Sequence, residues 1–183
     1  MGYLSITAIN KMGFKFIGQN VLVSDKASIY GAKNISIGDN SRIDDFAILS
    51  AGEGGINIGR YVHVACHATI IGQGLIRLCD FSGISSRVAI YSSSDSYDGE
   101  WMTNPCVPEH VRNTHHAPVH IGKHVVVGTG STILPGVELL DGCAVGAMSL
   151  VNKKFKELSI ITGVPAKLIK TRKNIIFNLE NEI

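Results

Sequence analysis

The stretch from Ile121 to Val151 carries an aliphatic residue at every sixth position, and this period restricts the possible folds more than any other feature of the sequence. The six positions are Ile121, Val127, Ile133, Leu139, Val145 and Val151. A small or β-branched residue follows each of the first five after four positions, at Val125, Ser131, Val137, Cys143 and Ser149. An α-helix repeats near 3.6 residues and a strand near two, so neither explains the pattern. A hexapeptide repeat predicts an all-β parallel β-helix.

The rest of the chain follows the same rhythm from Val23 onwards, with short glycine-rich insertions at 51–55 and 72–74. Three hexads make a coil of 18 residues, and equivalent coil starts fall at Ile35, Ile56, Ile76 and Val119. Their spacings are 21 (56 − 35), 20 (76 − 56) and 43 (119 − 76), so the last interval exceeds one coil by 25 residues (43 − 18). The sequence therefore predicts one long excursion at 92–118.

The excursion contains the one tryptophan of the chain, Trp101, and three of its five prolines. Loops longer than about 12–15 residues in compact folds are often functional. The segment is too rich in aromatic residues for a disordered linker. We expect an ordered arm that lies on a neighbouring surface.

The remaining organisation predicts an N-terminal cap at 1–22, the β-helix at 23–152 and an exit segment with a helical tail at 153–183. Pro165 suits the first turn of a short helix. We expect the tail to cover the open edge of the last coil, which would otherwise be free to pair with another strand.

Composition excludes several classes of function. The net charge of +2 is too small to indicate a nucleic-acid-binding protein. We expect no membrane insertion, because no run of about 18 apolar residues exists. The N-terminus lacks a secretion signal, and the four cysteines are widely spaced without a Cys-x-x-Cys pair. These features predict a reduced, cytoplasmic protein.

The repeats of 121–151, followed by Gly163-Val-Pro-Ala-Lys-Leu-Ile169, resemble the hexapeptide-repeat acyltransferases, and most closely the sugar O-acetyltransferases. That branch contains galactoside and maltose acetyltransferase-like enzymes and surface-polysaccharide acetyltransferases. The resemblance spans about residues 30–172. It implies a left-handed parallel β-helix, a homotrimer with active sites between subunits, and acetyl-CoA as the co-substrate. Galactoside-type enzymes carry a catalytic His-Pro pair where this chain has Ser92-Ser-Ser-Asp95, so the general base must be elsewhere or the mechanism differs.

Four histidines are candidates for the general base, which typically contributes 10²–10⁴-fold to the rate. His67 is the first candidate, because it resembles the turn where sugar-nucleotide N-acetyltransferases of this fold hold their base; His63 is the second. His115 and His116 end the arm and could reach a neighbouring subunit. The plain alternative for each is a surface histidine. A neighbouring carboxylate would tune whichever one acts.

The acceptor and the cofactor have separate candidates. Asp95, Tyr97 and Trp101 offer a carboxylate and aromatic faces to a sugar, although Trp101 would equally explain an arm pinned to the prism, and Arg87 offers a cation to a phosphate. The resemblance places coenzyme A along Gly128, Gly130, Ser131, Ala147, Met148, Ala166, Lys167 and Lys170. Arg172 belongs to a basic cluster that suits the phosphates of CoA. We expect no metal, because a His-x-x-x-His zinc pair at 63 and 67 would need a helix.

The sequence thus predicts an acetyl-CoA-dependent acetyltransferase with a sugar or nucleotide-sugar acceptor, and O-acetylation in surface-polysaccharide biosynthesis is the first choice. N-acetylation of a nucleotide-linked amino sugar is the alternative. A non-catalytic trimeric scaffold is the alternative of a different class.

Overall fold

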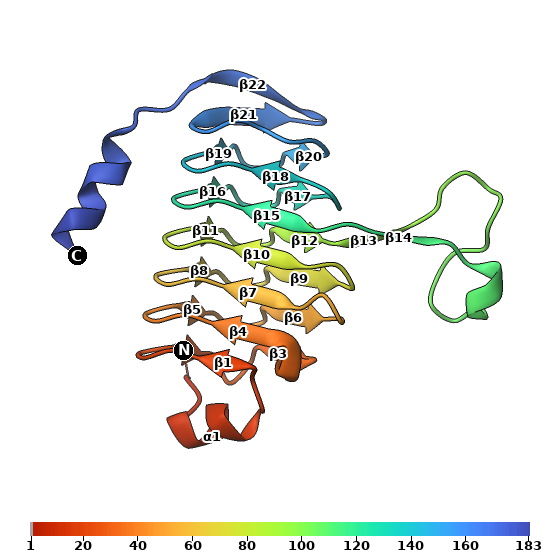
Figure 1. Cartoon of the computed structure of the whole chain (residues 1–183), viewed down its shortest axis with the longest axis horizontal. Coiled ribbons are helices and arrows are strands. Elements are labelled where there is room, and N and C mark those ends of the chain that lie inside the picture. Colours follow the sequence, from red (N-terminus) through yellow and green to blue (C-terminus); the bar gives the residue numbers. More distant parts are fainter. Residues whose placement is uncertain (1) are drawn as a thin grey trace.

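The computed structural model describes residues 2–183, which form a prism with three parallel β-sheets as its faces (Figure 1). The first sheet contains β1 (Phe16–Ile17), β4 (Ile35–Ile37), β7 (Ile56–Ile58), β10 (Ile76–Leu78), β15 (Val119–Ile121) and β18 (Glu138–Leu139). The second contains β2 (Leu22–Val23), β5 (Arg42–Ile43), β8 (His63–Val64), β11 (Gly83–Ile84), β16 (Val126–Val127), β19 (Ala144–Val145), β21 (Ser159–Gly163) and β22 (Ala166–Thr171). The third contains β3 (Ser28–Tyr30), β6 (Ile48–Ala51), β9 (Thr69–Gly72), β12 (Ala89–Tyr91), β17 (Thr132–Ile133) and β20 (Leu150–Val151). The fold is the predicted left-handed parallel β-helix.

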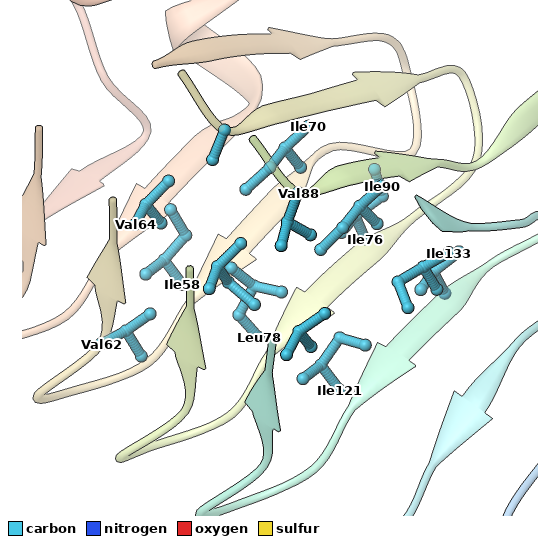
Figure 2. Close-up of a cluster of buried hydrophobic side chains, with 14 of the residues drawn as sticks. Ile58, Val62, Val64, Ile70, Ile76, Leu78, Val88, Ile90, Ile121 and Ile133 are labelled. Atoms are coloured by element: carbon cyan, nitrogen blue, oxygen red, sulfur yellow. The ribbon is translucent and has the colours of Figure 1, made fainter. Parts of the chain in front are cut away.

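The six-residue period arises because each hexad contributes one short strand and the turn that follows it. Equivalent residues of successive coils are in register, so Ile56 pairs with Ile76 and Ile76 with Val119. The repeating aliphatic side chains point into the prism and stack on one another (Figure 2). The residue four positions later is also buried, as Val125 and Ser131 show. The interior is therefore a column of aliphatic layers, which confirms the pattern read from 121–151.

We call the turns between the first and second sheets the first corner, those between the second and third sheets the second corner, and those between the third and first sheets the third corner. Some corner positions with a positive φ hold glycine, such as Gly130 and Gly142. Most corners instead hold a residue with a side chain, such as Tyr61 at φ 55° and Phe81 at φ 60°. This backbone conformation is uncommon for residues with a Cβ. Stacking compensates for it, since the rings of Tyr61 and Phe81 lie 5.1 Å apart and those of Phe81 and His124 lie 5.0 Å apart.

The N-terminal segment forms α1 (Ile6–Lys11) and then the first strand, β1. Ser5 caps the helix by accepting the N–H of Ala8 at 3.2 Å, and Ile9 is buried against the first coil. β1 pairs with β4, so the first strand of the prism lies within 1–20. A short 3₁₀ helix, η1 (Ala32–Asn34), forms the third corner of the first coil, between β3 and β4.

The C-terminal segment differs from the prediction in two ways. The expected helix at Pro165 is wrong: the chain adds β21 beside β19 and then turns back as β22, which pairs antiparallel with β21. The tail, η3 (Ile175–Glu182), does not cover the last coil, because β22 covers that edge of the second sheet and the tail descends beside the prism (Figure 1). Its Phe177 lies edge-on against His124, and Arg172 anchors it by donating to the carbonyls of His124 and Gly142 at 2.9 and 3.1 Å.

No helix within residues 2–183 is long and apolar enough to cross a membrane.

Candidate functional site

The predicted excursion is an ordered arm that leaves the third corner between β12 and β15. Its base is an antiparallel pair, β13 (Ser93–Asp95) and β14 (Thr114–His116), and its outer part contains the 3₁₀ helix η2 (Glu109–Val111). Asp95 closes the loop by accepting the N–H of Asn104 at 3.1 Å and the hydroxyl of Thr114 at 3.3 Å. The arm projects away from the prism (Figure 1), so Trp101 does not pin it onto the coils of its own chain.

The aromatic residues of the arm are open to solvent. Tyr97 is 92% exposed and Trp101 is 42% exposed. Both belong to a loop whose backbone is held by Asp95, so their exposure is a property of an ordered segment. Exposed aromatic side chains on an ordered projection are typical of residues that contact another molecule.

The four candidate histidines lie in three separate places. His67 is at the second corner, where its ring stacks on Phe46 with centroids 5.0 Å apart. His63 is on the outer face of β8 in the second sheet. His115 and His116 are at the base of the arm, where Nδ1 of His116 lies 2.8 Å from the hydroxyl of Ser93. Within one chain, therefore, the arm histidines do not join the other two.

His63 is the one of these four for which the structure shows a carboxylate partner among residues 2–183. Its Nε2 lies 2.8 Å from Oδ2 of Asp44 and 2.9 Å from a terminal nitrogen of Arg42. Arg42 and Asp44 are themselves an ion pair, with Nε and Oδ1 2.9 Å apart. Neither Arg42 nor Asp44 is a candidate from the sequence alone. Aligning the coils would place Arg42 beside His63, because the two occupy the same outward position in neighbouring strands.

Five of the residues expected to hold CoA lie together along the second corner of the C-terminal coils, at Gly128, Gly130, Ser131, Ala147 and Met148. The turn at Gly128 lies directly below the turn at Ala147: a Cβ added to Gly128 would lie 2.6 Å from the backbone nitrogen of Ala147. A Cβ on Gly130 would lie 2.5 Å from the sulfur of Met148. The small residues at this edge therefore allow the turns to pack closely, while Met148 remains 70% exposed.

Two of these residues turn their side chains inward. Ser131 is fully buried, and its hydroxyl donates to the carbonyl of Gly146 at 3.0 Å and accepts the N–H of Ser149 at 3.2 Å. Ala166 is also buried. Lys167 and Lys170, by contrast, are exposed on β22 at the end of the second sheet.

Arg87 belongs to the same corner column as His67 and Gly130. Successive turns of that column are joined by backbone hydrogen bonds, from the N–H of Arg87 to Cys66 and from that of Gly130 to Ser86. Arg87 thus lies between the first-choice histidine and the glycine-rich edge.

Two hollows open on the outside of the prism. One, of about 360 Å³, lies on the second sheet and is lined by Asn20, Leu22, Asn40, Ser41, Arg42, Tyr61, Val62 and His63. The other, of about 420 Å³, lies on the first sheet, and its lining includes Arg77, Cys79, Asp80, His120 and Asp141. In the hollow on the first sheet, the thiol of Cys79 lies 3.9 Å from Nε2 of His120, and burial raises the pKa of this thiol. A raised pKa disfavours the thiolate, so the pair does not make a nucleophile.

The described part of the chain contains neither a cluster of metal-binding side chains nor a disulfide bond. Residues 2–183 contain no group of three or more histidine, cysteine, aspartate or glutamate side chains placed to hold a metal ion. All four cysteines are free.

Comparison with known proteins identifies close relatives along the whole chain. No protein-family model matches it. It is 49% identical over 181 residues to a dTDP-4-amino-4,6-dideoxy-D-glucose acyltransferase of Escherichia coli, covering 99% of this chain and 94% of that protein. It is 24% identical over 148 residues to the galactoside O-acetyltransferase of E. coli K12, covering 81% and 69% of the two chains.

Solved structures of AntD, an N-acyltransferase from Bacillus cereus, superpose closely on the chain. A serine-to-alanine variant of AntD in complex with dTDP-4-amino-4,6-dideoxyglucose and coenzyme A gives a TM-score of 0.94 at 42% identity, covering 99% of this chain and 96% of AntD. A complex of AntD with dTDP and 3-hydroxybutyryl-CoA gives a TM-score of 0.91 at 42% identity, covering 98% and 95%.

Proposed function

The chain belongs to the hexapeptide-repeat acyltransferases, and on this basis we propose that it transfers an acetyl group from acetyl-CoA to the 4-amino group of a dTDP-linked amino sugar. The observation that carries the proposal is the end-to-end similarity to an acyltransferase named for dTDP-4-amino-4,6-dideoxy-D-glucose. The AntD complexes, which hold the same amino sugar or its nucleotide together with coenzyme A, support it. These relatives favour the amine acceptor over the hydroxyl acceptor that was the first choice from sequence, and they give no support to a non-catalytic scaffold.

The second corner fits coenzyme A in its chemistry. The stacked turns at 128–131 and 146–149 expose Ala147 and Met148, whose small and apolar side chains suit a narrow pantetheine chain. Lys167 and Lys170 would meet the phosphates beyond it. The buried Ser131 and Ala166 would support this wall from inside without touching the cofactor through their side chains. When bound, the cofactor supplies an activated thioester.

The reaction needs no acyl-enzyme if both substrates bind together. The neutral amine attacks the thioester carbonyl, a carbon–nitrogen bond forms, the carbon–sulfur bond breaks, and the proton lost by nitrogen ends on the released thiol. A backbone N–H would stabilise the developing oxyanion. Those of Gly128 and Gly130 already bond to the carbonyls of Val145 and Ser86, which leaves Thr129 as the candidate donor on this turn.

A neutral amine is already nucleophilic, so we propose that no single histidine is essential. Deprotonation before attack matters more for a hydroxyl acceptor. His67 lies on the same corner column as the cofactor wall and is the best placed of the four histidines to accept a proton.

Two residues of the acceptor site are suggested by spacing. Solved AntD variants carry substitutions at a serine and at an aspartate that lie ten positions apart. Ser85 and Asp95 of this chain are also ten positions apart (95 − 85). Ser85 follows β11 at the second corner, next to Gly128 in the following coil, since its N–H bonds to the carbonyl of Val127 at 3.0 Å. Asp95 is at the base of the arm.

We propose that three copies of the chain assemble so that the arm of one contacts the prism of the next. Exposed Tyr97 and Trp101 on a projecting arm support this arrangement. It would bring Asp95, His115 and His116 to a site shared by two chains. Light scattering after size-exclusion chromatography would give about three times the mass of one chain if the proposal holds, and the mass of one chain if it does not.

We place the enzyme in the cytoplasm, where acyl-CoA and nucleotide sugars are made, and its four free cysteines fit that location. The product keeps its diphosphate and remains an activated sugar, which is the form that surface-polysaccharide biosynthesis consumes.

The direct test is an assay of purified protein with acetyl-CoA and dTDP-4-amino-4,6-dideoxyglucose, following thiol release and the mass of the nucleotide sugar. We expect one acetyl group to be added per thiol released. Thiol release without a change in the mass of the sugar, or equal rates with maltose and a galactoside, would overturn the proposal.

A further inference from the structure

We infer that the hollow on the second sheet binds the nucleoside diphosphate of the acceptor, with Tyr61 stacking on the pyrimidine and Arg42 and His63 holding the diphosphate. The inference rests on the proposed function, because it assigns a place to one part of the proposed substrate. It assigns roles to Tyr61 and Arg42, which the sequence did not single out, and gives His63 a role other than that of general base. Four features support it: an aromatic face, a polar edge, a cationic centre and an open path to the cofactor wall.

Tyr61 provides the aromatic face. One face of its ring is covered by Phe81, at a centroid distance of 5.1 Å and an angle of 9° between the rings. The next position of the same corner column holds Asn40, which is too small to cover the other face, and both residues line the hollow. Stacking on Phe81 fixes the plane of the Tyr61 ring before any ligand arrives. An aromatic face held in this way suits a base, for which stacking contributes about 1–3 kcal/mol.

Asn20 and Asn40 provide the polar edge beside this face. The amide nitrogen of Asn20 donates to the amide oxygen of Asn40 at 3.1 Å. This bond uses one donor of Asn20 and one acceptor of Asn40, so the amide nitrogen of Asn40 still offers donors to the hollow. A pyrimidine carries carbonyl oxygens and an N–H at its edge, which match amide groups of this kind.

Arg42 provides the cation, and His63 lies beside it. Their side chains are 42% and 44% exposed, whereas the side chain of Asp44, which pairs with both, is only 7% exposed. The carboxylate therefore lies beneath, Nε of Arg42 is buried beside it, and the exposed parts of the guanidinium and the imidazole line the hollow. Asp44 holds the guanidinium and the imidazole in fixed positions, since its two oxygens lie 2.9 Å from Nε of Arg42 and 2.8 Å from Nε2 of His63. A planar guanidinium held in this way is suited to phosphate oxygens.

An open path leads from this centre to the cofactor wall. On the second sheet His63 pairs with Gly83, and Gly83 pairs with Val126. A Cβ added to Gly83 would meet no atom within 4 Å, so the sheet is uncovered between His63 and β16. Two strand spacings amount to about 10 Å. A sugar attached to a diphosphate at His63 can thus extend over Gly83 toward the turn at Gly128.

The larger hollow on the first sheet is a poorer place for a diphosphate. Two carboxylates, Asp80 and Asp141, line it. Each accepts the backbone N–H of the preceding turn, from Arg60 at 2.9 Å and from Lys123 at 2.8 Å. Asp80 is also paired with Arg60 at 3.0 Å, so the charge of Asp141, for which residues 2–183 show no ion pair, is the one that repels phosphate at this hollow. Arg77 lines this hollow and is exposed, which makes it a matched control for Arg42.

The test measures dTDP affinity by calorimetry, with CoA affinity measured on the same samples. We expect Arg42→Gln to weaken dTDP binding at least tenfold, because a charge-assisted contact contributes about 1.5–3 kcal/mol. Tyr61→Leu should weaken it about fivefold or more through lost stacking. Arg77→Gln should leave it unchanged. None of the three should alter CoA affinity, which shows that each variant is folded.

Asp44→Asn tests whether Asp44 positions the phosphate ligands or instead acts with His63 as a catalytic pair. Removing a negative charge beneath Arg42 and His63 should keep or tighten dTDP binding. The double variant Arg42→Gln with Asp44→Asn leaves no unpaired buried charge. It should still bind dTDP at least tenfold more weakly than the wild type does. Unchanged dTDP affinity in this double variant, or weaker dTDP binding in Arg77→Gln instead, would overturn the inference. Acetyl transfer by the wild type would still leave the proposed function intact. A wild type that neither binds dTDP nor acetylates the amino sugar would instead overturn the function.

Discussion

Replacing Ser131 by alanine tests whether this serine contacts coenzyme A or supports the wall behind it. The hydroxyl is fully buried and accepts the N–H of Ser149 at 3.2 Å. It also donates to the carbonyl of Gly146, which keeps a second donor, the hydroxyl of Ser149 at 2.7 Å. Alanine therefore leaves one buried N–H without a partner. A buried donor without a partner costs about 1–3 kcal/mol.

For a chain of this length a loss of 1 kcal/mol lowers the melting temperature by about 2–4 °C. We therefore expect Ser131→Ala to melt about 2–12 °C below the wild type in a calorimetric scan, with an unchanged KM for acetyl-CoA. Thr129→Ala is the matched control, since Thr129 lies on the same turn but is exposed. An unchanged melting temperature together with a tenfold rise in KM would refute the inward orientation of the hydroxyl.

Three further predictions concern the acceptor, the tail and the arm. His67→Ala should lower kcat less than tenfold, because the amine acceptor needs little base catalysis; a loss of 10²–10⁴-fold would indicate a general base. The hydrogen bond from His124 holds the pKa of Glu180 below its usual value, so this contact stabilises the docked tail above about pH 4.3 and is lost as the pH falls through the lowered pKa. The protection of residues 174–183 against hydrogen exchange, relative to the intrinsic rate at each pH, should therefore fall on acidification in the wild type and already be lowered at neutral pH in Glu180→Gln; equal protection in the two at neutral pH would contradict this. Trp101→Ala should weaken assembly and lower kcat/KM for the sugar, while the melting temperature of the single, unassembled chain stays unchanged. A melting temperature lowered by several degrees would show that Trp101 packs within its own chain.

The sequence predicts most of this fold because one physical requirement recurs at every coil. Each hexad must place an aliphatic side chain in the interior, and Ile121, Val127 and Ile133 do so at identical positions. The arm is equally predictable, because 25 residues inserted between two regular coils have no place in the prism.

The corners and the C-terminal end are less predictable because tertiary contacts override local preference there. Nothing local indicates that Phe81 and His124 adopt a positive φ, since stacking between coils stabilises that conformation. The segment after Pro165 forms a strand because β21 presents an edge to pair with, and no local pattern of residues shows that edge.

The candidate site also has a part that the sequence predicts and a part that it does not. The proposed cofactor wall at 128–131 and 147–148 comes from the resemblance to hexapeptide-repeat acyltransferases, and the repeat shows that these residues belong to consecutive coils. The group of Arg42, Asp44 and His63 was not, because its members come from two coils and meet only when the register of β5 and β8 is known. The proposed contacts of the arm with a neighbouring copy depend on the surface of a second chain, which the repeat pattern of one chain does not describe.

The central claim is that the acceptor atom is the nitrogen of a nucleotide-linked amino sugar. The most direct measurement compares kcat/KM for acetyl transfer to dTDP-4-amino-4,6-dideoxyglucose and to dTDP-glucose, whose C4 carries a hydroxyl. The proposed function predicts rapid transfer to the amine and no detectable product with the hydroxyl. Comparable transfer to both, or transfer to the hydroxyl alone, would contradict it.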